Sequence, residues 1–141
     1  GLDLSLGISH LDGTVKDIRL PAGRITDRDM PMTPNLGLNA LARYTWPMFE
    51  GHLALQADAT YTSSFNFYVV NPPQAQEPRH TVVNARISYR TGDSRWESAL
   101  AVKNLTNEAY RLYTNDISSL SIGLDGFAPP RWVSASLLYR W

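Results

Sequence analysis

Residues 130–141 read P-R-W-V-S-A-S-L-L-Y-R-W, an alternation of residue types that is typical of a β-strand. Successive side chains of an extended strand point to opposite sides. Counted back from the terminus, one face is wholly uncharged and holds Val133, Ala135, Leu137, Tyr139 and Trp141. The opposite face is mostly polar and holds Trp132, Ser134, Ser136, Leu138 and Arg140. The stretch therefore predicts an amphipathic strand, which a soluble sandwich or a membrane protein could equally use.

Five further stretches show the same alternation, at residues 2–9, 36–46, 52–61, 81–90 and 95–103. Across the six predicted strands, one face carries no Asp, Glu, Lys or Arg. Every charged strand residue falls on the second face: Asp3, Arg43, Asp58, Arg86, Arg90, Arg95, Glu97, Lys103 and Arg140. Because 18% of the chain is charged, an even spread would have placed several charges on the first face. No helical periodicity of comparable length competes with this pattern.

The predicted connections alternate between long and short. Long polar connections span 11–33, 62–79 and 104–129, whereas residues 47–51 and 91–94 form short turns. Outer-membrane barrels have short periplasmic turns and long extracellular loops. Aromatic residues on the uncharged face also gather near the short turns, as interfacial girdles do: Tyr44, Trp46, Tyr89, Trp96, Tyr139 and Trp141. A soluble antiparallel sheet explains the alternation but predicts neither of these regularities, so we favour a transmembrane barrel.

Composition excludes several functional classes. The 13 basic and 13 acidic residues balance and are scattered, which argues against a nucleic-acid-binding surface and an electrostatic membrane anchor. The absence of cysteine excludes disulfides, thiolate metal sites and a cysteine nucleophile. The sequence contains no apolar run of about 18 residues, so it predicts no transmembrane helix. A barrel strand needs only about 10 residues with alternate ones apolar. The chain starts inside a strand pattern without a signal peptide, so we expect it to be a piece of something longer.

Three stretches carry a family resemblance. Residues 102–110, V-K-N-L-T-N-E-A-Y, resemble the motif that precedes the last loop of TonB-dependent outer-membrane receptors. Residues 129–141 are similar to the closing strand of those receptors, with Trp141 where the family usually ends in Phe. Residues 33–40, T-P-N-L-G-L-N-A, look like the family's recurrent strand start.

The resemblance implies an all-β fold in which 1–141 are the C-terminal six antiparallel strands of a 22-stranded barrel in the bacterial outer membrane. The N-terminal strands and the plug would lie outside this sequence, because six strands cannot close such a barrel. It implies active import of a scarce ligand such as a ferric siderophore, energised by TonB through the plug region. Expected partners are outer-membrane lipid and, through Trp141, the barrel-assembly machinery. A porin-like passive channel and a soluble β-sheet binding module remain the alternatives.

Enzymatic chemistry finds no support in the sequence. His10, His52 and His80 are far apart and match no metal-binding spacing, and no phosphate-binding or nucleophile motif occurs. We therefore expect no catalytic residues, no cofactor and no metal site.

Ligand contacts, if any, are expected in the long connections and the adjoining lumen, at Phe65, Phe67, Tyr68, Arg79, Arg111, Arg131 and Trp132. The aromatic side chains offer a binding surface, and the arginines offer paired donors for an anion. Alternatively, the aromatics pack loop against loop and the arginines pair with the loop acids Glu77, Glu108 and Asp116, which we favour. The inward charges are expected to form ion pairs with each other or with a plug: Asp58, Arg86, Glu97 and Lys103.

Overall fold

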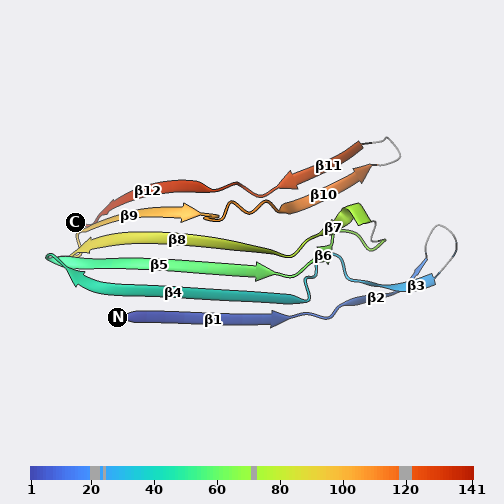
Figure 1. Ribbon diagram of the computed structural model, residues 1–141, viewed down its shortest axis with the longest axis horizontal. Helices are drawn as coiled ribbons and strands as arrows, with labels where there is room; N and C mark the ends of the chain where they lie inside the picture. Colours follow the sequence, from blue (N-terminus) through green and yellow to red (C-terminus); the bar gives the residue numbers. More distant parts are fainter. Residues whose placement is uncertain (20–22, 24, 71–72, 118–121) are drawn as a thin grey trace.

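A computed structural model describes the whole chain except residues 20–22, 24, 71–72 and 118–121. Its main feature is a six-stranded antiparallel sheet (Figure 1). In spatial order, which is also chain order, the strands are β1 (Leu2–His10), β4 (Leu36–Met48), β5 (Gly51–Thr62), β8 (His80–Thr91), β9 (Trp96–Lys103) and β12 (Trp132–Tyr139). The predicted all-β fold with six antiparallel strands is confirmed. In the described residues, β1 and β12 are the two edges of an open sheet, so a closed barrel is not observed.

The predicted division into two faces is also confirmed. Directly opposed residues of antiparallel strands share a face, and the register aligns Leu2, Tyr44, Leu55, Ile87, Leu100 and Ala135 in one row. The adjacent row on the opposite face runs through Asp3, Arg43, Gln56, Arg86, Ala101 and Ser134. No Asp, Glu, Lys or Arg of the six strands lies on the face that contains Leu100, hereafter the apolar face.

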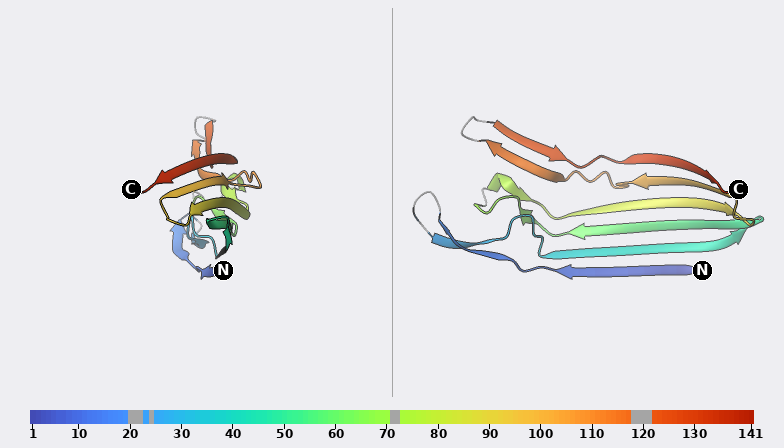
Figure 2. Two further views of the ribbon diagram at one scale, coloured as in Figure 1. Left: turned by 90° about the vertical axis from the view of Figure 1, so that its left-hand side faces the viewer. Right: turned by 180° about the vertical axis from the view of Figure 1, so that it is seen from behind.

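The sheet is a single layer. Both views in Figure 2 show strands without a second sheet or helix packed against either face. Buried apolar side chains are correspondingly few in the described part of the chain: Ala54, Phe67, Ala75 and Ala99. Large apolar side chains of β1 instead stand exposed, with Leu6 at 85% and Ile8 at 77%. None of the described residues belongs to a helix that is long and apolar enough to cross a membrane.

Both short turns lie at one end of the sheet, near the C-terminus (Figure 1). Phe49 and Glu50 form the two-residue loop between β4 and β5, and Phe49 adopts a left-handed φ of 55°. Residues 92–95 join β8 to β9, and the Gly92 amide donates to the Glu50 carbonyl at 2.7 Å. A Cβ at position 92 would collide with that same carbonyl oxygen, so glycine permits the two turns to touch.

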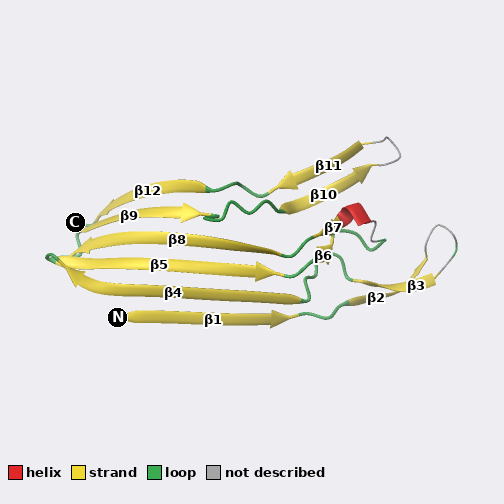
Figure 3. Cartoon of the chain, viewed as in Figure 1, coloured by secondary structure: helices red, strands yellow, loops and turns green. Residues whose placement is uncertain are grey.

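The long connections at the opposite end contain short strands that the sequence pattern did not predict. They fold into three two-stranded ribbons, shown with the short helical turn η1 (Pro73–Ala75) in Figure 3. The ribbons are β2 (Thr14–Arg19) with β3 (Ile25–Asp29), β6 (Phe65–Asn66) with β7 (Gln76–Glu77), and β10 (Arg111–Ile117) with β11 (Ile122–Phe127). Register shifts between Val15 and Ile18 and between Arg111 and Tyr113 interrupt the period-two pattern, which explains why it was missed.

The terminal strand ends slightly earlier than predicted. β12 stops at Tyr139, so Arg140 and Trp141 lie beyond it. The Arg140 amide still donates to the Arg95 carbonyl at 2.8 Å, which extends the pairing with the neighbouring chain segment by one hydrogen bond. The Trp141 side chain is fully exposed at the end of the sheet.

Candidate binding surfaces

The structure brings four of the seven predicted ligand-contact residues together at the ribbon end of the sheet. Phe65 lies on β6, Phe67 and Tyr68 follow it, and Arg111 begins β10. Phe65 and Phe67 meet edge to face, with ring centroids 5.1 Å apart. The Arg111 guanidinium lies over the Phe67 ring at 5.6 Å, and the Tyr68 hydroxyl donates to the Thr114 carbonyl at 2.6 Å. These contacts tie the connection between β5 and β8 to the ribbon between β9 and β12.

Arg111 is committed to holding the connections together. Its Nε donates to Glu77 Oε2 at 2.8 Å, and its backbone amide donates to Glu77 Oε1 at 3.0 Å. Its terminal nitrogens donate to the carbonyls of Gln74 at 2.9 Å and Gln76 at 2.5 Å. Only 15% of the Arg111 side chain and 3% of the Glu77 side chain are exposed. Loop packing therefore accounts for these contacts of Arg111, and Glu77 is one of the loop acids that were expected to pair with the arginines.

A shallow depression opens beside this ion pair. Its volume is about 280 Å³, and it is lined by Gln74, Ala75, Arg111, Thr114, Asn115, Gly123 and Asp125. Asp125 Oδ1 lies 3.7 Å from Arg111 Nη1, so the charged groups on its wall are already close to each other. The depression can accept a small polar group through amide, hydroxyl and carboxylate contacts.

The remaining predicted residues are placed separately. The Arg131 amide donates to Asn107 Oδ1 at 2.9 Å, and its Nη1 donates to the Leu105 carbonyl at 3.3 Å. Trp132 is 49% exposed and lies opposite Lys103 on the polar face of the sheet, as predicted. Arg79 is exposed in the segment that leads into β8.

Asn104, within the motif at residues 102–110, holds the start of the connection that follows β9. Asn104 is 5% exposed, and its left-handed φ of 51° turns the chain out of β9. Its side-chain nitrogen donates to the carbonyls of Glu108 and Pro129, at 2.9 and 3.3 Å. Its side-chain oxygen accepts the Glu108 amide at 2.8 Å. The Asn84 side chain in turn accepts the Asn104 backbone amide at 3.0 Å, which connects this residue to β8.

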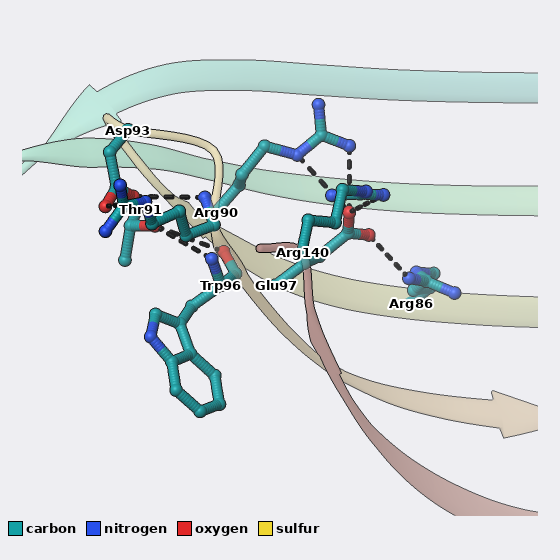
Figure 4. Close-up of polar contacts among 8 residues, drawn as sticks. Arg86, Arg90, Thr91, Asp93, Trp96, Glu97 and Arg140 are labelled. Carbon is teal, nitrogen blue, oxygen red and sulfur yellow. Dashed lines mark hydrogen bonds and ion pairs between the residues drawn. The ribbon is translucent and has the colours of Figure 1, made fainter.

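The polar face of the sheet holds a cluster of arginines that sequence reasoning found only in part. Glu97 Oε1 lies 3.2 Å from Arg86 Nη2, and Glu97 Oε2 lies 2.8 Å from Arg90 Nη2 (Figure 4). Arg140 Nη2 approaches the same carboxylate at 3.6 Å. Arg86 and Glu97 were among the four inward charges expected to form ion pairs, but that set did not include Arg90 and Arg140. Both arginines could have been found by listing the charged residues that neighbour Glu97 across the predicted strands.

Asp58 and Lys103 form no ion pair with the other inward charges within the described residues. Asp58 Oδ2 accepts a hydrogen bond from the side-chain nitrogen of Asn84 at 2.6 Å. Lys103 makes no ion pair within the described residues. The histidines also remain separate, and His80 stacks on Tyr110 with ring centroids 4.4 Å apart. In the part of the chain that is described, no three His, Cys, Asp or Glu side chains form a group able to hold a metal ion.

No family model, curated protein or solved structure matches this chain. The resemblance to the receptor family therefore rests on the sequence of residues 33–40, 102–110 and 129–141.

Proposed function

We propose that the chain forms six strands of a bacterial outer-membrane β-barrel that belongs to a TonB-dependent importer. The observation that carries the proposal is the apolar face, which is uncharged, exposed and not covered by any described element. Leu4, Leu100 and Leu137 are 69%, 55% and 70% exposed on it. Soluble proteins rarely leave so extended an apolar surface in water, whereas the outer surface of a barrel meets lipid there.

Strand length supports a membrane-spanning role. A tilted barrel strand needs about 9 to 11 residues to cross the hydrocarbon core. β4 has 13 residues, β5 and β8 have 12 each and β1 has 9, which is enough to cross it, whereas β9 and β12 have 8 each and are slightly shorter than that length. The polar face would then line the interior of the barrel, where water or protein can satisfy its charges.

The aromatic residues support the orientation. Tyr44 and Trp46 lie 5.5 Å apart between ring centroids, and Trp96 and Tyr139 lie 4.6 Å apart. All four are on the apolar face in the half of the sheet that ends in the short turns. Amphipathic rings are favoured at headgroup depth. In this proposal the short turns are periplasmic, and the three ribbons extend outside the cell.

Import of a ferric siderophore or a similar small ligand is proposed from the resemblance at residues 102–110 and from the ribbons. The depression beside Arg111 and the exposed Arg79 are the described features best placed to meet such a ligand. TonB would act through a plug region that this sequence does not contain. A passive channel would have the same barrel strands but no plug. A soluble binding module would have the six-stranded sheet but would not lie in a membrane.

Two experiments test the proposal. Membrane fractionation of the producing bacterium is expected to place the protein in the outer membrane, and a soluble cytoplasmic product would refute the barrel. The coding sequence upstream is expected to encode a plug and a TonB-coupling segment, by analogy with plugged barrels. Their absence would leave the wall intact and favour the passive channel.

A further inference from the structure

A trough crosses the polar face close to the short turns. Its floor is a cross-strand row of small side chains, which includes Thr45, Ala54 and Ser88. The rows on either side carry long polar side chains, with Arg43 in one row and His52, Arg90 and Glu97 in the other. The difference in side-chain length creates a depression of about 270 Å³, lined by Arg43, Thr45, His52, Ala54, Ser88, Arg90, Ser94 and Glu97.

The trough offers mainly hydrogen-bond donors. Within the described residues, the Arg43 guanidinium makes no ion pair or side-chain hydrogen bond. Hydroxyl groups of Thr45, Ser88 and Ser94 line the same space. The one carboxylate on its wall is Glu97, which is already contacted by three arginines.

Positive charge is in excess around the trough. Four arginines surround it or contact its wall, namely Arg43, Arg86, Arg90 and Arg140. The carboxylates in the flanking rows are those of Asp3, opposite Arg43, and Glu97. The arginines around Glu97 are accessible, with 42%, 47% and 50% of the side chains of Arg86, Arg90 and Arg140 exposed (Figure 4).

We propose that this trough binds a small oxyanion, a phosphate or a carboxylate group of a diffusible molecule. Arg43 and Arg90 supply planar guanidinium donors from opposite sides, which suits the two or three oxygens of such a group. Glu97 is a positioning residue, because it accepts from Arg90 Nε and Nη2 at 3.3 and 2.8 Å and leaves Nη1 for the ligand. The site requires this part of the polar face to stay open to solvent in the complete protein, and it does not depend on which ligand the proposed importer carries.

The test is a titration of the complete protein in detergent micelles with inorganic phosphate and, separately, with acetate at low ionic strength. Calorimetry is expected to show saturable binding that weakens as salt is added, since exposed charges are screened. Arg43→Gln is expected to weaken binding roughly tenfold or more, because it removes a charge-assisted pair of donors. Arg43→Lys keeps the positive charge but lacks the paired donors of the guanidinium, so it is expected to bind more tightly than Arg43→Gln and more weakly than the wild type.

Arg95→Gln is the matched control. Arg95 lies in the nearby turn, pairs with Asp93 and does not line the trough, so phosphate binding should be unchanged. Absence of saturable binding, or equal binding by the wild-type protein and Arg43→Gln, would overturn the proposal. A preference for phosphate or for acetate identifies the kind of oxyanion. Outer-membrane fractionation of Arg43→Gln is expected to match the wild type, so failure of the anion site is distinguishable from failure of the barrel.

Discussion

Trp96 and Tyr139 lie directly opposite each other on β9 and β12, with ring centroids 4.6 Å apart and an angle of 42° between ring planes. This pair joins the last strand to the sheet on the apolar face. A double-mutant cycle with Trp96→Ala and Tyr139→Ala should give a coupling free energy of about 0.5 to 1.5 kcal/mol, as for other aromatic pairs. The measurement is denaturant unfolding of the membrane-reconstituted protein. Additive effects of the two substitutions would show that the rings do not interact.

The buried ion pair between Glu77 and Arg111 should govern the stability of the ribbons. Arg111→Ala leaves an almost fully buried carboxylate without its partner, and the expected local destabilisation is about 3 kcal/mol. Hydrogen exchange should accelerate in residues 63–79 and 111–117 while the six-stranded sheet keeps its protection. Arg79→Ala is the control, because that exposed side chain should not affect exchange. Unchanged protection in Arg111→Ala would contradict the role of the pair.

Asn104 combines a backbone role with a hydrogen-bonding role, and two substitutions separate them. Asn104→Ala loses the side-chain hydrogen bonds and strains the left-handed backbone, whereas Asn104→Gly loses only the hydrogen bonds. Both should destabilise the protein, and the alanine variant should be less stable than the glycine variant by about 1 kcal/mol. Thermal unfolding of the two variants checks this order. Equal stabilities would mean that the φ of Asn104 costs nothing.

The stability of the turn between β8 and β9 should depend on pH through the Asp93 carboxyl group. The hydrogen bond from the Thr91 hydroxyl, followed by the one from the Arg95 amide, holds the pKa of the Asp93 carboxyl below its usual value. Because the folded pKa is depressed, the stabilisation is complete above the unfolded value and is lost as pH falls through the folded value. The Arg95 amide resonance should therefore titrate at acidic pH in NMR spectra. Asp93→Asn should abolish that titration.

The sheet could be predicted from the sequence because its pattern is long and regular. Side chains from Leu2 to Tyr139 keep one period of two in each strand, and a slip of one residue would have exchanged every apolar and polar side chain. The register observed between β9 and β12, from Trp132 opposite Lys103 to Tyr139 opposite Trp96, follows from that constraint.

The ribbons and the arginine cluster could not be predicted as well, for different reasons. The ribbons are short, two of them contain register shifts, and Asp17 in β2 adopts a left-handed conformation that breaks the alternation. The contacts around Glu97 depend on which residues become cross-strand neighbours. Arg140 reaches Glu97 only through pairing of segments that are far apart in the chain. The predicted Arg111–Glu77 pair was one of several combinations that the sequence left open.

Introducing a charge on the apolar face should lower the free energy of unfolding more than introducing the same charge on the polar face. Leu100→Arg places a charge on the apolar face and should cost about 2 to 4 kcal/mol if the residue lies near the bilayer midplane. Ala101→Arg places the same charge on the polar face beside Arg86 and Ser134 and should cost much less. Unfolding of both variants in lipid vesicles measures the difference. Equal costs would be inconsistent with lipid on one side only.

The most direct test of the membrane proposal is spin-label accessibility at these same two positions in lipid vesicles. Residues 1–141 contain no cysteine, so Leu100→Cys and Ala101→Cys each introduce one labelling site into this part of the protein. A label at 100 should be readily accessible to oxygen, which dissolves in the bilayer, and poorly accessible to a water-soluble nickel complex. A label at 101 should be less accessible to oxygen, because it faces the interior of the barrel. Greater nickel accessibility at 100 than at 101, or the same environment at both, would contradict the assignment of the apolar face to lipid.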